Sequence, residues 1–388
     1  MGQASEPEMA RQIMLAFADD TGLLNDASNP TRYLWTDAHA ICNLLSLHGI
    51  TGEDSYLELA TELIDQVHSV LGRHRRDDAR TGWISGLEYQ EGGEHPTAGG
   101  LRIGKKLPER EPAEVFDERL EWDRDGQYFH YLTKWMHALC RAASLTGDDR
   151  YLRWAIELAK AAHAGFRTPG WDGNYRLYWK MSIDLTRPQV PSSGLHDPLD
   201  AFITYNEIQA CKQRVSLNFM DTNLDDEIRE AAGMIVGQSF ETNDPLGIGG
   251  LLFDCARVIQ LIAEPRFTDP ELGLVLAEAS VKSLESFLRD NSLSTPAEYR
   301  LAFRELGLCI GIAGIRLAFD IIERNPDRFN KSLRKCLASL VPHLPVAEDI
   351  VEFWTKPENQ RVPSWNEHLD INRVTLATSL LPAEFVRI

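Results

Sequence analysis

Charged and polar side chains recur at intervals of three and four residues in several helical segments, and these side chains are the candidates for chemistry. His130 and Lys134 stand at this spacing in one segment, and Asp200, Thr204 and Glu207 in a later one. Residues three or four apart lie on the same face of a helix, so each set forms a polar stripe. Such a stripe either faces a cavity or makes hydrogen bonds that close a solid core. We expect these stripes to face a cavity.

Glycoside hydrolysis is the first reaction that these residues favour. It requires one protonated carboxyl group beside the leaving oxygen and one carboxylate that activates water or attacks carbon. Asp37, Asp125, Asp200 and Glu207 can supply the pair. We assign the two catalytic carboxyl groups to Asp125 and Asp200, and we expect the protein to be an enzyme.

Epimerisation of a sugar is the alternative reaction. It requires two bases on opposite sides of a carbon next to a carbonyl group, a role that suits histidine. Histidines stand near the starts of several predicted helices, and we assign the paired bases to His130 and His368. A third alternative, from another class, is a protein that binds a ligand or another protein without catalysis.

Substrate-binding candidates come from the same helix starts and from tryptophans, whose rings can stack on sugar faces. They are Trp35, Asp37, His39, Lys134, Trp171, His196, Glu207, Arg300, Arg304 and Trp365. Asp197 and Asp244 each precede a proline. We assign both to helix capping, because Asp at the N-cap with Pro at the first helical position is a favoured helix start.

The helices that carry these residues are predicted to form a repeat. The segment TGEDSYL at 51–57 matches TGDDRYL at 146–152, and each follows a helix rich in aromatic residues and cysteine. The glycine ends one helix in the left-handed conformation, and the aspartate caps the next. The repeating unit is therefore an inner helix, a tight turn and an outer amphipathic helix.

Six such hairpins account for nearly the whole chain. Inner helices are expected to begin near residues 33, 127, 198, 245, 296 and 365, and the N-terminal helix at 6–20 can pair with the last of them. Thr295 and Ser364 are each expected to open a helix through a capping box. The Gly247-Ile248-Gly249-Gly250 run is assigned to close helix packing rather than to a nucleotide site.

Two connections are much longer than the others, at about 73–126 and 167–197, and both lead from an outer helix to the next inner one. Long connections in a compact domain are usually functional or disordered. Their many aromatic residues indicate order. Their common direction predicts that both lie at one rim of a single domain spanning residues 1–388.

The hairpin number and the turn and cap pattern resemble the six-hairpin glycosidase superfamily. This resemblance implies an all-α fold, an (α/α)6 barrel or toroid. Relatives with this fold include glycoside hydrolases, unsaturated uronyl hydrolases, sugar 2-epimerases and some polysaccharide lyases, and they bind sugar where the inner helices begin. A sugar-like small molecule is therefore the expected partner.

Composition excludes several other classes. The chain of 388 residues is 43% hydrophobic and 25% charged, with a net charge of −18. An acidic chain without Lys/Arg clusters is not expected to bind nucleic acid. No signal peptide, membrane span, zinc spacing or phosphate-binding glycine loop is found, so we expect a cytoplasmic protein with no membrane partner, metal or cofactor. The oligomeric state is not predicted.

The charge of the substrate is a further hypothesis. Lys134, Arg257, Arg300 and Arg304 all lie on stripes assigned to the cavity, although the whole chain is acidic. A cation that faces inward needs a nearby acid or an anionic ligand. Unless Asp254 and other acids pair with these cations, the surplus favours an anionic sugar.

Overall fold

Helices dominate the computed structural model, which describes residues 5–24, 30–170, 173–215, 223–264, 267 and 269–388. The contacts within the chain divide it into two compact units. Unit 1 comprises residues 1–17, 42–53 and 238–388, and unit 2 comprises residues 18–41 and 54–237. The division falls inside the first two helices. The expectation of one domain over the whole chain stays a prediction.

Unit 2 contains three of the expected helical hairpins and both long connections. Its elements are the first part of α2 (Leu34–Thr51), α3 (Asp54–Leu71), α4 (Tyr89–Glu94), α5 (Glu118–Asp123), β1 (Gln127–Tyr128), α6 (Phe129–Thr146), α7 (Asp149–Phe166), β2 (Arg167–Pro169), β3 (Tyr175–Met181), β4 (Pro188–Ser193), α8 (Asp197–Arg214) and α9 (Asp225–Ile235). Helix α6 packs against α7 and α8, and α8 packs against α9. The tight turn between α6 and α7 has the predicted form: Gly147 is left-handed, and Asp148 accepts a hydrogen bond from the Arg150 amide.

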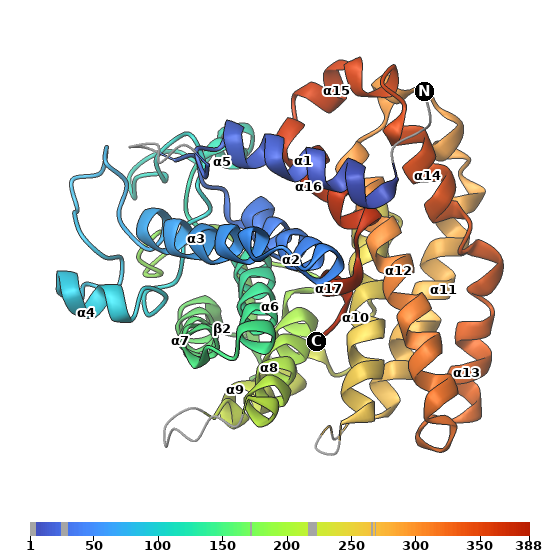
Figure 1. Cartoon of the computed structure of the whole chain (residues 1–388). Helices are drawn as coiled ribbons and strands as arrows, with labels where there is room; N and C mark the ends of the chain where they lie inside the picture. The colour runs from blue at the N-terminus through green and yellow to red at the C-terminus, as the bar shows by residue number, and fades with distance from the viewer. Residues whose placement is uncertain (1–4, 25–29, 171–172, 216–222, 265–266, 268) are drawn as a thin grey trace. The chain divides into compact units, whose positions relative to one another are not determined.

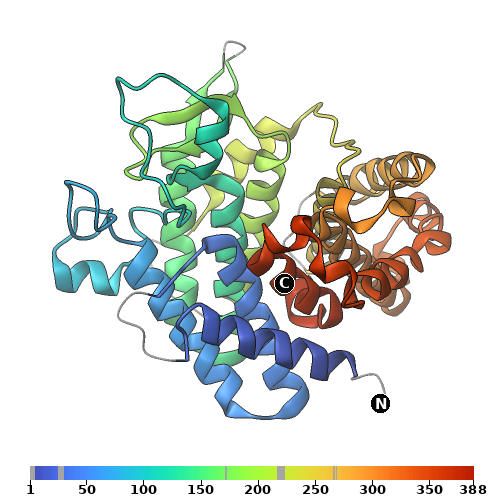
Figure 2. The ribbon, with the colours of Figure 1, turned by 90° about the horizontal axis from the view of Figure 1, so that it is seen from above.

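The long connections of unit 2 are ordered where the structure describes them, and they meet in a small antiparallel sheet. β3 pairs with β1, β2 and β4, with Tyr128 opposite Lys180. Figure 2 shows these strands in green. The second inner helix was expected to include Gln127, but this residue lies in β1. Its side chain accepts from the Leu101 amide and donates to the Ile183 carbonyl, and these contacts hold it in the sheet.

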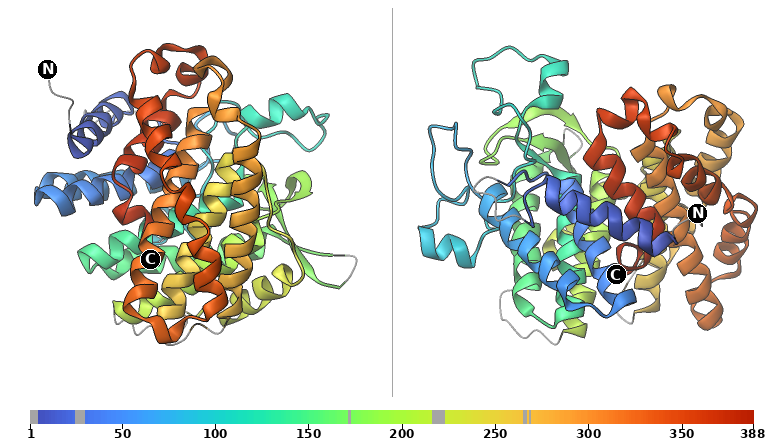
Figure 3. Two further views of the ribbon diagram at one scale, coloured as in Figure 1. Left: turned by 90° about the vertical axis from the view of Figure 1, so that its right-hand side faces the viewer. Right: turned by 45° about the horizontal axis from the view of Figure 1, so that its top comes forward.

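Unit 1 contains the remaining helices. Its elements are α1 (Glu6–Asp20) as far as Phe17, the last part of α2, α10 (Pro245–Ala263), α11 (Glu271–Arg289), α12 (Ala302–Arg324), α13 (Lys331–Ala338), α14 (Val346–Thr355), α15 (Pro363–Asn366), α16 (Leu369–Leu380) and α17 (Ala383–Val386). Helix α10 packs against α11 and α12, and α12 packs against α14 and α16. Helices α10 to α13 lie side by side in Figure 1 and in the left view of Figure 3.

Both capping boxes predicted in unit 1 are wrong. The segment after Thr295 is a short 3-10 turn, and α12 begins only at Ala302. The Ser364 hydroxyl donates to the Ala297 carbonyl instead of capping a helix. Asp244, in contrast, caps α10 as predicted by accepting from the Gly247 amide at 3.0 Å.

Helix α10 is the apolar centre of unit 1. Most of its residues from Ile248 to Leu261 are buried. By length and hydropathy alone, this helix could cross a membrane. The expectation that the sequence contains no candidate for a membrane span is therefore wrong. Two-thirds of its most apolar stretch is buried inside the structure, which is typical of the core helix of a globular unit.

Close packing of α10 on α12 depends on glycine. A Cβ atom on Gly249 would stand 2.2 Å from the Gly307 carbonyl oxygen, and one on Gly311 would stand 2.3 Å from the Gly249 carbonyl oxygen. Both contacts are with backbone atoms, which cannot rotate away. The glycine run therefore allows two backbones to approach, as the sequence predicted.

Gly249→Ala is expected to lower the free energy of unfolding by at least about 1–3 kcal/mol, because the added methyl group overpacks a backbone contact. Gly250 is the matched control, since a Cβ atom there meets nothing within 4 Å. Gly250→Ala should raise stability by roughly 0.5–1 kcal/mol through the lower backbone entropy of alanine. Urea unfolding of both variants tests this, and equal midpoints would contradict it.

Candidate active site

The first turns of α6 and α8 bring an acid–base cluster together in unit 2. Helix α6 contributes His130, Thr133 and Lys134, and α8 contributes Asp197 and Asp200. The three- and four-residue spacing places each set on one side of its helix, and the packing of α6 on α8 brings the two sets into contact.

Asp200 is held as a charged carboxylate. The Lys134 ammonium lies 2.9 Å from each of its two oxygens, and the Thr133 hydroxyl donates to one of them at 2.7 Å. The side chain of Asp200 is 7% exposed and that of Lys134 is 17% exposed. An ammonium so close to a carboxylate favours the ionised form of the acid.

Asp197 stands one helical turn before Asp200, and it is not a cap. His196 is the N-cap residue of α8, and no side-chain hydrogen bond caps this helix. The Asp197 carboxyl group is buried against Gly194, and its Oδ2 atom has no hydrogen-bond partner among the described residues. Its other oxygen lies 3.7 Å from Nδ1 of His130. The capping role assigned from the sequence is therefore wrong for Asp197.

The environment of Asp197 favours its protonated form. Burial raises the pKa of this carboxyl group from its usual 3.8 to about 7, and the negative charge of Asp200 adds to the shift. Lys134 opposes it. Burial therefore favours the neutral form of Asp197, whereas the ammonium of Lys134 beside Asp200 favours the charged form of that carboxyl group.

His130 is the accessible base of the cluster. Its side chain is 40% exposed, and its ring stacks on Tyr128 with an interplanar angle of 13°. Desolvation by the surrounding groups lowers the pKa of His130; Asp200 counteracts this effect, and Lys134 adds to it. The imidazole is therefore neutral near pH 7.

Deeper residues on the same stripes close a solid core. His137 and Glu207 are both buried, and their side chains approach to 2.6 Å. His39 is also buried, and desolvation holds its pKa well below the usual range. At this depth the polar stripes make hydrogen bonds between helices, and they do not face the cavity that the sequence analysis expected.

Asp37 and Trp35 lie at the start of α2 and are also buried. Asp37 accepts from the Tyr33 amide at 2.9 Å and forms an ion pair with Arg32. The ring of Trp35 lies against His39, with centroids 4.2 Å apart. These contacts order the beginning of the first inner helix.

Asp125 has the surroundings of a structural group. Its carboxylate accepts from Arg102 at 2.8 Å and Arg75 at 3.2 Å, and from the amides of Gly104 at 2.9 Å and Gly126 at 3.1 Å. The residue is fully buried. Because this carboxylate has four protein donors and no exposed surface, a substrate would have to displace protein groups to reach it. We therefore leave Asp125 out of the proposed reaction and assign the second carboxyl group to Asp197.

The remaining sequence candidates lie elsewhere. Arg300 and Glu305 form a bidentate ion pair at 2.8 and 2.6 Å in unit 1, and Arg304 pairs with Asp244. His196 is partly exposed beside Asp197. The ring of His368 packs on Phe303, and Trp365 is buried against Trp354. Trp171 lies outside the described residues.

The ion pairs remove the reason to expect an anionic substrate. Lys134 pairs with Asp200, Arg257 with Asp254 at 3.2 Å, and Arg300 and Arg304 with the acids named above. Each of the four cations that motivated the hypothesis has a carboxylate partner. The charge of the substrate is therefore not carried into the proposed function.

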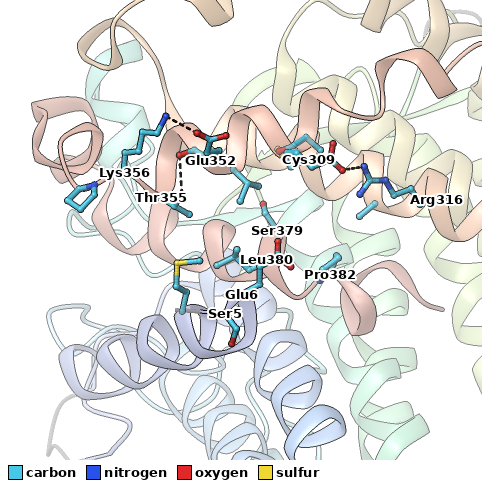
Figure 4. A pocket seen from close by; sticks show the side chains of 16 residues that line it. Ser5, Glu6, Cys309, Arg316, Glu352, Thr355, Lys356, Ser379, Leu380 and Pro382 are labelled. Atoms are coloured by element: carbon cyan, nitrogen blue, oxygen red, sulfur yellow. Dashed lines mark hydrogen bonds and ion pairs between the residues drawn. The ribbon is translucent and has the colours of Figure 1, made fainter. Parts of the chain in front are cut away.

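A cavity of about 800 Å³ lies within unit 1, away from every residue that the sequence singled out. It is lined by parts of α1, α12, α14 and α16, including Cys309, Thr355 and Leu380 (Figure 4). Its cations Arg316 and Lys356 pair with Glu348 and Glu352 at the surface. Because Glu348 and Glu352 in this lining are already paired with those cations, we place the chemistry at α6 and α8. No group of three or more His, Cys, Asp or Glu side chains suited to a metal ion occurs among the described residues.

No protein-family model matches the sequence, and no curated protein matches it. Solved structures do match. The α-1,6-mannanase GH76A of Salegentibacter sp. HEL1_6, bound to α-1,6-mannotetrose as an inactive variant, gives a TM-score of 0.54 at 14% identity, over 97% of this chain and 100% of that one. The GH76 α-mannanase of Bacteroides thetaiotaomicron gives 0.56 at 11% identity, over 99% and 97%.

A cellobiose 2-epimerase from Spirochaeta thermophila gives a TM-score of 0.48 at 11% identity, over 96% of this chain and 98% of that one, a likeness too low to carry an argument. The mannanase likeness shows the fold. The chain has the all-α, (α/α)6 fold of these two mannanases, as the sequence analysis expected.

Asp125→Asn is expected to lower the free energy of unfolding by about 3–5 kcal/mol, because it leaves the buried Arg102 charge without its carboxylate partner and removes one of the two carboxylate partners of Arg75. Chemical unfolding measures this loss. A variant of unchanged stability would show that Asp125 is free for another role.

Ionisation of Asp197 is expected to destabilise the fold. A pKa raised in the folded state gives stability that is fully present below the unfolded pKa of about 4 and is lost as pH rises to about 7. The loss amounts to at most about 4 kcal/mol. Asp197→Asn should lack this decline, whereas Asp226→Asn, at an exposed position on α9, controls for net charge and should keep it. If the free energy of unfolding changed with pH in the same way for wild type and Asp197→Asn, the raised pKa assigned to Asp197 would be contradicted.

Proposed function

We propose that the protein is a glycoside hydrolase in which Asp197 is the general acid and Asp200 the ionised carboxylate. Asp197 gives its proton to the oxygen that leaves, and Asp200 faces the positive charge that develops on the sugar. Lys134 and Thr133 hold Asp200 in place. The neutral His130 lies at the exposed side of the pair.

The observation that carries this proposal is the unequal ionisation of two carboxyl groups on one helical turn. Asp197 has a pKa of about 7, and Asp200 is paired with an ammonium at 2.9 Å. Neighbouring acids whose environments separate their pKa values are the recurring arrangement for acid catalysis near neutral pH. The fold shared with two α-mannanases supports the same reaction class.

The spacing of the pair predicts the stereochemistry. Side chains at i and i+3 have Cβ atoms about 5–6 Å apart. If the two carboxyl groups stand as close as their Cβ atoms, the pair has the roughly 5–5.5 Å of retaining enzymes rather than the 6.5–9.5 Å of inverting enzymes. Asp200 would then attack the anomeric carbon to form a glycosyl ester. Asp197, deprotonated in that step, would next take a proton from the water that hydrolyses the ester.

Epimerisation is the second candidate, and the state of His130 favours it. A neutral, accessible imidazole 3.7 Å from a protonated carboxyl group can act as the base of an acid–base pair. In this alternative, His130 removes the proton next to a sugar carbonyl and Asp197 supplies a proton. His368 lies in unit 1, so the second histidine expected from the sequence plays no part in this argument.

The activity test begins with the linkage bound by a mannanase of the same fold. α-1,6-Linked manno-oligosaccharides come first, followed by aryl glycosides, unsaturated uronides and free aldoses. Asp197→Asn and Asp200→Asn should each lower kcat/KM for hydrolysis about 10²–10⁴-fold and leave the melting temperature within a few degrees of wild type. Asp226→Asn should retain full activity.

The pH profile and the product give two further readouts. The kcat/KM of wild type should fall above about pH 7, where Asp197 loses its proton. NMR of the first product should show the retained anomer. Turnover of oligosaccharides by Asp197→Asn at the wild-type rate would overturn the assignment of Asp197 as the general acid. Absence of hydrolysis of every glycoside by wild type would overturn the hydrolase. Exchange of a sugar C2 proton with solvent, lost only in His130→Gln, would establish the epimerase instead.

A further inference from the structure

A series of aromatic rings leads from the candidate acid–base cluster to the surface of unit 2. His130 stacks on Tyr128 with centroids 5.5 Å apart, Tyr128 meets Trp179 at 5.3 Å, and Trp179 meets Trp122 at 5.6 Å. The residues come from the start of α6, from β1, from β3 and from α5, so both long connections contribute. Trp122 is 55% exposed at the outer end, and Trp179 is partly exposed.

The rings of this series face similar directions. Successive interplanar angles are 13°, 32° and 38°, whereas Tyr131 meets Tyr128 and His130 nearly at right angles. Edge-to-face contact is a common way for aromatic rings to pack in a core. Tyr128 is buried, so the rings of this series that reach the surface beyond His130 are those of Trp179 and Trp122.

A buried ion pair fixes the outer end of the series. The Lys180 ammonium on β3 lies 2.8 Å from the Glu121 carboxylate and donates to the carbonyl groups of Glu121 at 2.6 Å and Arg124 at 3.0 Å. Lys180 and Glu121 are both buried. These contacts tie the segment that carries Trp122 to the strand that carries Trp179. The two indoles are therefore positioned before any ligand binds, which lowers the entropic cost of binding.

More than half of the surface of Trp122 is exposed, and its ring contacts Trp179. A large exposed aromatic side chain gains no burial energy, and apolar patches near a site commonly mark ligand-binding surfaces. Indole rings combine a flat apolar face with a polar N–H, and the N–H of Trp179 already donates to the Ser192 hydroxyl at 2.8 Å. Its face is therefore the part left for a ligand.

We propose that Trp122 and Trp179 form a binding platform for the part of a linear oligosaccharide that extends beyond the cleaved or reacting unit. This inference rests on the proposed function, because the series begins at His130 beside Asp197. It deepens that function by assigning the substrate class: a chain of several sugar units rather than a monosaccharide. The apolar faces of successive sugar rings would stack on Trp179 and then on Trp122.

The test is an array of linear glycans of several linkages and increasing length, including mannose, α-1,6-mannotriose and α-1,6-mannotetraose. Wild-type affinity should rise with chain length for the recognised linkage. Trp122→Ala should lower affinity for the longest chain about tenfold, with a smaller loss for the shortest, and Trp122→Phe should restore most of it. Tyr299→Ala, at an exposed aromatic position in unit 1, is the matched control and should bind as wild type does.

The outcomes separate the platform from the catalytic proposal. Length-dependent binding that Trp122→Ala weakens, in a protein that hydrolyses none of the glycans, supports the platform and refutes the hydrolase. Hydrolysis that depends on Asp197, with affinity independent of chain length or of Trp122, overturns the platform alone. No binding to any glycan overturns it as well, as does a change of oligomeric state in Trp122→Ala during sedimentation, since the patch would then be a protein interface.

Discussion

The ion pair between Lys134 and Asp200 is the interaction on which the candidate site depends. It joins the first turns of α6 and α8, and both partners are largely removed from solvent. A charge pair in such a place is stabilising only when its geometry is good and its remaining bonds are satisfied. Thr133 supplies one of those bonds. Burial makes a negative charge at Asp197 unfavourable, and the fixed negative charge of Asp200 adds to this effect.

The two long connections build the surroundings of this pair. They meet in the small sheet of β1 and β3, where Tyr128 stands opposite Lys180 just before α6 begins. Buried charges in the connections, Asp125 with Arg102 and Lys180 with Glu121, hold irregular backbone in one conformation. Rigid loops around an acid–base pair are what catalysis requires, because misplaced groups lose rate steeply. In the proposed function, stability and catalysis thus depend on different acids in the same region.

Local signals in the sequence predicted much of the fold. Gly147, Asp148 and Asp244 act through their own turn or cap, and the glycines of α10 allow close packing as expected. The sequence was less informative about side chains whose roles depend on residues far away in the chain. Asp197 precedes a proline exactly as Asp244 does, yet only the folded chain shows that its carboxyl group turns inward. The pairing of Arg300 and Arg304 with acids likewise follows from tertiary contacts.

The central claim is that Asp197 stays protonated beside an ionised Asp200 near neutral pH. Infrared difference spectroscopy between wild type and Asp197→Asn reports it directly, since a protonated carboxyl group has a C=O stretch that a carboxylate lacks. The account predicts one such band at mildly acidic pH, assigned to Asp197, which disappears with a midpoint near pH 7. A band that is already absent at pH 5, or one that persists in Asp197→Asn, would contradict it.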